Sequence, residues 1–295
     1  MLLRDVKSEE KWLPGNSACP GCGLSLGLRL LAKAIEKPVV VIPASCASVV
    51  QGSWPKSSAS FPLLNIAMAG AGAAASGVAS AYEMLGKQGT VVAWAGDGGT
   101  ADIGLQALSG AAERGEDIIF VMYDNEAYMN TGIQRSSSTP HGAWTTTTPE
   151  GKREFKKDVA AIMLVHNLEY VATASVSYPT DFIEKLKKAE THKGTKFIQL
   201  YSPCPPGWRI DASKTIEVGQ LAVETGAWIL YEYENGRLSI SPISKRFKDK
   251  KSRRPLADYL SLQGRFSGIS NDDIAELEME MDKKWEFLSK FESQE

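Results

Sequence analysis

The chain has 295 residues, of which 43% are hydrophobic and 23% charged, so it can bury a large core. Lys and Arg number 33 against 35 Asp and Glu, and the net charge of -2 argues against general binding to nucleic acid or to an anionic membrane. The N-terminus carries charges too early for a signal peptide, and the longest weakly polar stretch, 66–82, consists of Ala, Gly and Ser rather than membrane-spanning residues. We therefore expect a cytoplasmic protein with a close-packed internal helix at 66–82.

Apolar runs of strand length alternate with helical segments from the N-terminus to about residue 201. The predicted strands are 39–43, 91–95, 118–123, 170–174 and 196–201. The predicted helices are 24–35, 67–85, 103–114, 156–165 and 179–188. This alternation predicts an α/β fold, in which a mainly parallel sheet has helices on both faces. Ligands of such sheets bind at the carboxyl ends of the strands, so the loops after Ala95 and Tyr123 are the expected place for chemistry.

The pattern changes after about Gly207. In order, the sequence predicts a helix at 216–225, a hairpin with Asn235-Gly236 at its turn, a basic run at 245–254 and a charged helical tail with Ile274, Leu277 and Met281 on one stripe. We divide the chain into an α/β domain at 1–210 and a C-terminal extension at 211–295. The extension is expected to pack on the core or on partner subunits.

The four cysteines occupy loops rather than apolar runs. Cys19 and Cys22 form a CxxC before a predicted helix, whereas Cys46 and Cys204 follow predicted strands. In a reducing cytoplasm they are expected to be metal ligands or inert thiols rather than disulfides. Redox disulfides, zinc sites and iron–sulfur sites all use CxxC, so its spacing leaves these alternatives open. All four thiols can nevertheless meet at one edge of the sheet, as a Cys₄ site requires.

A Gly-Asp-Gly segment follows the predicted strand 91–95. Gly96, Gly98 and Gly99 allow the backbone to approach a phosphate, and the amides of the next helix favour its charge. Asp97 inside this turn suggests a divalent metal, for which Mg²⁺ is suited because it shares oxygen ligands between protein and phosphate. Asn125 follows 28 positions later, after one helix and one strand. This combination matches the thiamine diphosphate pattern of GDG followed by Asn.

Four segments, taken in order, resemble the beta subunits of pyruvate or 2-oxoacid:ferredoxin oxidoreductases. They are Cys19-Pro-Gly-Cys22-Gly, Gly96-Asp-Gly-Gly-Thr-Ala-Asp-Ile-Gly104, Tyr128-Met-Asn-Thr-Gly132 and Ser138-Thr-Pro140. The resemblance covers most of residues 15–210. It implies the thiamine diphosphate-binding fold of the pyrophosphate type and three cofactors: thiamine diphosphate, Mg²⁺ and one 4Fe-4S cluster.

The resemblance also implies roles for individual residues. Asp97 and Asn125 would give side-chain oxygens to Mg²⁺, and Ala127 its carbonyl oxygen. The cluster ligands would be Cys19, Cys22, Cys46 and Cys204. The residues expected at thiamine diphosphate are Cys46, Gly96, Asp97, Gly98, Gly99, Asn125, Ala127, Tyr128, Asn130 and Thr131. No catalytic residue is assigned in this chain, because the glutamate that activates thiamine is expected on a partner subunit.

The activity implied is that of pyruvate synthase: CoA-dependent oxidative decarboxylation of pyruvate to acetyl-CoA and CO₂, with electrons passing through 4Fe-4S to ferredoxin. The enzyme would be active only with partner subunits of alpha, gamma and delta type, and no nucleic-acid or membrane partner is expected. Two alternatives stay open. One is a branched-chain 2-oxoacid or 2-oxoglutarate enzyme, and the other is a non-catalytic, metal-stabilised electron-transfer scaffold.

Overall fold

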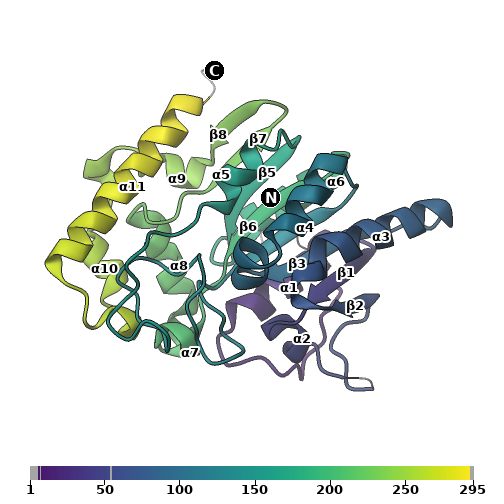
Figure 1. Cartoon of the computed structure of the whole chain (residues 1–295), viewed down its shortest axis with the longest axis horizontal. Coiled ribbons are helices and arrows are strands. Elements are labelled where there is room, and N and C mark those ends of the chain that lie inside the picture. The colour runs from purple at the N-terminus through teal and green to yellow at the C-terminus, as the bar shows by residue number, and fades with distance from the viewer. Residues whose placement is uncertain (1–5, 7, 54, 293–295) are drawn as a thin grey trace.

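One eight-stranded sheet runs through the part of the chain that the structure describes (Figure 1). The structure is a computed structural model, and it describes residues 6, 8–53 and 55–292. The strands are β1 Pro38–Pro43, β2 Leu63–Ile66, β3 Thr90–Gly96, β4 Ile119–Asp124, β5 Tyr170–Ser175, β6 Lys196–Tyr201, β7 Tyr231–Glu234 and β8 Arg237–Ile240. Their order across the sheet is β2-β1-β3-β4-β6-β5-β7-β8.

Helices lie on both faces of this sheet, as the alternation of strands and helices predicts. They are α1 Gly23–Ala34, α2 Cys46–Val50, α3 Ala71–Met84, α4 Leu105–Arg114, α5 Val159–Leu164, α6 Pro179–Thr191, α7 Pro205–Trp208, α8 Thr215–Glu224, α9 Pro242–Lys245, α10 Leu256–Leu260 and α11 Asn271–Phe291. Helices α1 and α6 share a hydrophobic cluster on one face, whereas α3, α4 and α5 contribute to the cluster on the other. The predicted α/β fold is confirmed.

The first six strands in chain order are all parallel, and each predicted strand is present within two residues of its expected ends. The sequence analysis missed β2, because Leu63–Ile66 is only four residues long and half exposed at the edge of the sheet. Helix α5 begins later than predicted, because Asp158 caps it by accepting a hydrogen bond from the Ala161 amide.

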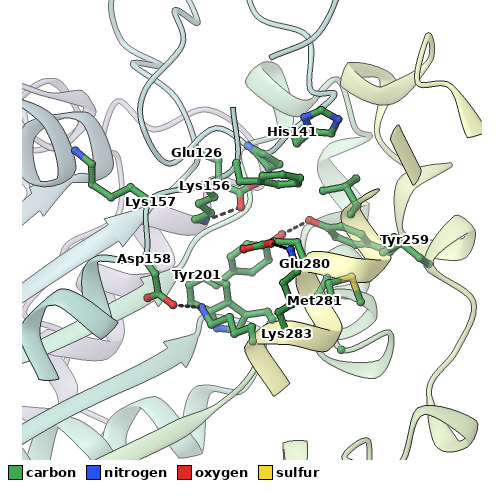
Figure 2. A pocket seen from close by; sticks show the side chains of 18 of the residues that line it. Glu126, His141, Lys156, Lys157, Asp158, Tyr201, Tyr259, Glu280, Met281 and Lys283 are labelled. Carbon is green, nitrogen blue, oxygen red and sulfur yellow. Dashed lines mark hydrogen bonds and ion pairs between the residues drawn. The ribbon is translucent and has the colours of Figure 1, made fainter. Parts of the chain in front are cut away.

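The predicted hairpin is confirmed as β7 and β8, with Asn235 and Gly236 at positive φ in its turn. It pairs antiparallel with β5 and so extends the same sheet. The tail forms α11, which buries Trp285 and Leu288 against the core. A cavity of about 390 Å³ lies between α11 and the carboxyl end of β6, with Tyr201 among its lining residues (Figure 2).

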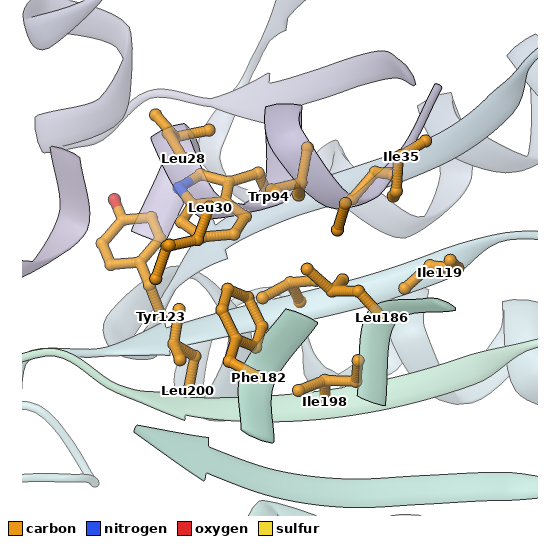
Figure 3. Close-up of a cluster of buried hydrophobic side chains, with 14 of the residues drawn as sticks. Leu28, Leu30, Ile35, Trp94, Ile119, Tyr123, Phe182, Leu186, Ile198 and Leu200 are labelled. Carbon is orange, nitrogen blue, oxygen red and sulfur yellow. The ribbon is translucent and has the colours of Figure 1, made fainter. Parts of the chain in front are cut away.

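Large side chains fill the layer between the sheet and the helices α1 and α6 (Figure 3). Trp94 of β3 is fully buried there, and its ring stacks against Tyr123 of β4 at a centroid distance of 5.8 Å. A Cβ at Gly27 would lie 3.0 Å from the Trp94 ring, so glycine allows α1 to pack directly on the sheet. The packing of this layer fixes the positions of the strands whose carboxyl ends form the site.

Replacing Phe182 of α6 with Ala is expected to lower the free energy of unfolding by about 3–5 kcal/mol, because the ring is fully buried and its loss leaves a cavity. Chemical denaturation followed by circular dichroism would measure this. The control is Leu85→Ala, whose side chain is 67% exposed and should change stability by no more than about 0.5 kcal/mol. Equal effects at the two positions would contradict the assigned core.

The Ala/Gly/Ser-rich helix differs from its prediction in one respect. Residues Ala71, Gly72, Ala75 and Ser76 of α3 are buried, and a Cβ at Gly72 would lie 2.6 Å from the Ala107 carbonyl oxygen of α4. The second half of α3 projects from the sheet, and Met84 at its end is 87% exposed, so this helix is internal only in its first half. Among the described residues, no helix combines the length and the apolar character needed to cross a bilayer.

Candidate functional site

Four neighbouring strands bring the predicted site residues to one edge of the sheet. Strands β1, β3, β4 and β6 are adjacent and parallel, so their carboxyl ends lie together. Cys46 follows β1, Asp97 follows β3, Asn125 follows β4 and Cys204 follows β6. The loops that the sequence singled out therefore meet where parallel sheets bind their ligands.

The glycine-rich loop after β3 forms a π-helical turn, Gly98–Asp102, before α4. Thr100 donates from its hydroxyl to the Gly96 carbonyl at 2.8 Å and ties the turn to the end of the strand. A Cβ at Gly98 would lie 2.4 Å from the Tyr128 ring, whose hydroxyl donates to the Gly98 carbonyl. Glycine is therefore required here because a side chain from the next loop covers the backbone.

Replacing Gly98 with Ala is expected to weaken thiamine diphosphate binding by about 5- to 150-fold. Overpacking typically costs about 1–3 kcal/mol, and 1.4 kcal/mol corresponds to a factor of ten. Calorimetric titration of the cofactor would measure the change. The matched control is Gly77→Ala, since a Cβ at Gly77 meets no atom within 4 Å. Unchanged affinity in Gly98→Ala would contradict the role of this loop.

One cavity of about 140 Å³, called the cofactor cavity below, is lined by every residue that the sequence predicts at thiamine diphosphate. Its predicted lining residues are Cys46, Gly96, Asp97, Gly98, Gly99, Asn125, Ala127, Tyr128, Asn130 and Thr131. The lining also includes Ser45, Ser48 and Met68, which the sequence analysis did not select. The structure thus brings the ten residues together, and their contacts with a cofactor stay a prediction.

Three oxygen-bearing groups meet at the expected magnesium position. The Asn125 amide lies 2.8 Å from Asp97 Oδ1 and 3.0 Å from the Ala127 carbonyl oxygen. With its nitrogen toward them the amide donates two hydrogen bonds, whereas with its oxygen toward them three oxygens face one another. The second arrangement is favourable only around a cation, and carboxylate, amide and carbonyl oxygens are the ligands that Mg²⁺ prefers. The donor set therefore fits the ion.

Asp97 is buried, and its other oxygen, Oδ2, accepts a hydrogen bond from the Ser136 hydroxyl at 2.5 Å. Burial raises the pKa of Asp97 well above its usual range, and the nearby carboxylate of Asp124 raises it further. Sequence reasoning missed Ser136. The available signal was the run Ser136 to Ser138, whose last residue begins the motif Ser138-Thr-Pro140.

A buried group of charges supports the loop after β4. Lys156 Nζ lies 2.7 Å from Asp124 Oδ2 and 2.8 Å from Glu126 Oε1. Burial raises the pKa of Asp124 despite Lys156. Burial would also raise the pKa of Glu126, but Lys156 and Arg265 outweigh it and lower that pKa. Glu126 and Lys156 lie at the wall of the 390 Å³ cavity (Figure 2).

The four cysteines line another cavity, of about 100 Å³, which lies beside the cofactor cavity. We call it the thiol cavity. The CxxC turn approaches the Cys204 loop closely: the Gly23 amide donates to the Pro203 carbonyl, and a Cβ at Gly23 would lie 2.8 Å from that oxygen. This contact explains why glycine follows the CxxC motif. Cys46 and Cys204 start the short helices α2 and α7, at the first position and the N-cap respectively.

The thiols are poor acids in this setting. Burial raises the pKa of Cys46 to about 12 and that of Cys204 to about 12, and the other thiols of the group add to the effect. Burial also raises the pKa of Cys22. Ligation requires thiolates, so metal binding at this place must displace protons.

The two cavities share Cys46, Asn125 and Asn130 in their linings. Within residues 6, 8–53 and 55–292, no three His, Cys, Asp or Glu side chains are arranged to hold one metal ion. Four thiols around a common cavity suit a cluster better, because a 4Fe-4S cluster distributes its ligands over several iron atoms. The site therefore combines a glycine-rich loop, a set of oxygen donors and four cysteine thiols.

This fold and this loop arrangement are those of a thiamine diphosphate-binding domain. Residues 47–200 match the family model described as thiamine pyrophosphate enzyme, C-terminal TPP binding domain. The ketoisovalerate oxidoreductase subunit VorB of Pyrococcus horikoshii is 51% identical over 97% of this chain and 94% of its own. The pyruvate synthase subunit PorB of Methanothermobacter marburgensis is 47% identical over 94% and 96%. The chain belongs to the thiamine diphosphate-dependent 2-oxoacid:ferredoxin oxidoreductase family.

A solved structure supports the fold independently. The 2-oxoglutarate:ferredoxin oxidoreductase from Magnetococcus marinus superposes with a TM-score of 0.58, covering 75% of this chain and 80% of that chain at 24% identity. This likeness confirms the thiamine diphosphate-binding α/β architecture that the motifs imply.

Proposed function

We propose that this chain is the thiamine-binding subunit of a pyruvate synthase, which needs partner subunits of alpha, gamma and delta type. Its reaction would be the oxidative decarboxylation of pyruvate with coenzyme A, and ferredoxin would accept the electrons. The observation that carries the proposal is the adjacency of the two cavities. Cys46 lines both the thiol cavity and the cofactor cavity. A redox centre held by the four thiols would therefore lie close enough to take electrons directly from the thiamine site.

Different residues of this chain would bind Mg²⁺, the diphosphate and the cluster. Asp97, Asn125 and the Ala127 carbonyl would hold Mg²⁺ against the diphosphate, which the glycine-rich loop would approach through its backbone. The four cysteines would hold a 4Fe-4S cluster. Thiamine diphosphate would supply the nucleophile and the electron sink that decarboxylation of a 2-oxoacid needs. The activating glutamate would come from a partner subunit.

A branched-chain 2-oxoacid is the second candidate substrate, because a ketoisovalerate oxidoreductase subunit is 51% identical to this chain and a pyruvate synthase subunit 47%. Pyruvate stands first because the stretch Asn125 to Gly132 resembles the pyruvate-type enzymes. The two substrates differ by a short apolar branch, which typically changes specificity by about 10–200-fold.

The test is an anaerobic assay of the purified native complex with pyruvate, ketoisovalerate and 2-oxoglutarate, using a dye acceptor. We expect CoA-dependent dye reduction with the highest kcat/KM for pyruvate, and none without coenzyme A. A higher kcat/KM for ketoisovalerate would select the second candidate. If none of the three acids is oxidised although the complex binds thiamine diphosphate, the chain serves a non-catalytic role and the proposal is wrong.

A further inference from the structure

The backbone between two of the proposed magnesium ligands is strained. Glu126 separates Asn125 from Ala127 and has a φ of 67°, in the left-handed region that costs a non-glycine residue about 1–2 kcal/mol. The side chain of Glu126 is only 4% exposed. This conformation turns the Asn125 side chain and the Ala127 carbonyl toward the same point. Because it is strained, other contacts must stabilise the Glu126 backbone.

Two cationic side chains form ion pairs with the Glu126 carboxylate. Lys156 Nζ lies 2.8 Å from Oε1, and Arg265 Nη2 lies 2.5 Å from Oε2, so each oxygen has its own partner. Arg265 belongs to a 3₁₀ turn, Gly264–Phe266, in the C-terminal part of the chain, and its side chain is 2% exposed. Buried charges are tolerated only when they are well paired, and this carboxylate meets that condition.

Other distant residues hold the backbone of the same loop. Trp208 donates from its indole nitrogen to the Asn125 carbonyl at 2.7 Å, and Thr139 donates from its hydroxyl to the Glu126 carbonyl at 2.7 Å. The guanidinium carbon of Arg265 lies 3.9 Å from the centre of the Trp208 ring. The anchors of this loop therefore also support one another.

We infer that Arg265 and Lys156 are positioning residues: by clamping Glu126, they hold Asn125 and Ala127 in the geometry that binds Mg²⁺. The inference rests on the proposed thiamine diphosphate function. It gives the C-terminal extension a part in cofactor binding, because Arg265 reaches the loop from outside the parallel α/β core. Neither residue touches the cofactor cavity in its own right, since neither lines it.

The test is the Mg²⁺ concentration that gives half-maximal thiamine diphosphate binding, measured by calorimetry on the whole complex after removal of both cofactors. We expect Arg265→Met to raise this concentration about 10–100-fold, the usual loss when a residue that orients a metal ligand is removed. Arg265→Lys keeps the charge and should show a smaller rise. Excess Mg²⁺ should restore thiamine diphosphate binding in both variants.

The matched control is Lys185→Met. Lys185 is also a buried cation, and it donates to Asp181 Oδ2 and to the Thr173 carbonyl, both at 2.8 Å, away from the cofactor cavity. Its loss should lower the melting temperature of the complex without changing the Mg²⁺ requirement.

A wild-type Mg²⁺ requirement in Arg265→Met would overturn the inference. If Arg265→Met does not assemble, the same result in Arg265→Lys would overturn it. Failure of the wild-type complex to bind thiamine diphosphate with Mg²⁺ would instead contradict the proposed function.

Discussion

Replacing Asp97 with Asn is expected to remove activity and Mg²⁺-dependent thiamine diphosphate binding together. The change keeps the size of the side chain and its acceptance of the Ser136 hydrogen bond but removes the charge that would face the ion. Removing one partner of a buried ion pair costs about 3–5 kcal/mol, which corresponds to a loss of affinity of about 150- to 4,000-fold. Calorimetric titration and steady-state assays of the complex would measure both losses.

Stability separates this effect from simple misfolding. Burial and Asp124 already disfavour the charged form of Asp97, so without cofactors the Asp97→Asn complex should be at least as stable as the wild type. Asp181→Asn serves as the control, because it also neutralises a mostly buried carboxylate but lies outside the cofactor cavity. Asp97→Asn that binds thiamine diphosphate with wild-type Mg²⁺ dependence would remove Asp97 from the proposed ligand set.

Replacing Cys204 with Ser should have the second large effect, loss of the proposed 4Fe-4S cluster. A serine hydroxyl is a much weaker ligand for iron than a thiolate, and the cavity holds no fifth cysteine, since the chain has four. We expect the iron content of the anaerobically purified complex to fall by up to about four atoms per copy of this chain, together with its visible absorbance. Electron transfer to the acceptor should fall in parallel.

Thiamine diphosphate binding is the internal control for Cys204→Ser, because Cys204 lines the thiol cavity but not the cofactor cavity. Ser17→Ala is the matched variant, since Ser17 lines the same cavity without a thiol. An unchanged iron content in Cys204→Ser would show that the fourth ligand lies elsewhere. Zinc in place of iron in the wild-type complex would exclude the cluster altogether.

Local patterns were sufficient to predict most of the fold. The strands flanking the motifs stand out because buried parallel strands are continuous runs of Val, Ile and aromatic residues, as in Ile119–Asp124. The glycines at 96, 98 and 99 and the CxxC turn stand out because close backbone approaches require particular residues at particular places. Short edge elements such as Leu63–Ile66 carry no such signal, since they are half exposed and lack a period.

The supporting residues of the site were not predictable in the same way. Ser136 contacts Asp97, whereas Lys156 and Arg265 contact Glu126, and the separation between Arg265 and Glu126 is 139 residues. From sequence, a charged residue in a polar stretch is expected to be exposed to solvent. Only the tertiary structure shows that it is buried against a partner distant in the chain. Lys156 stands at the start of the predicted helix 156–165, yet its side chain is only 22% exposed and is paired with two carboxylates.

The amino-acid sequence alone established the α/β class, the glycine-rich and cysteine loops and the family resemblance, because turn residues and hydrophobic periods are local properties of a chain. It did not establish that the thiol cavity adjoins the cofactor cavity. That depends on strand order: β6 inserts between β4 and β5, which places the Cys204 loop beside the Asn125 loop. Strand order follows from how all the helices pack on the sheet, so it is a property of the assembled core rather than of any single segment.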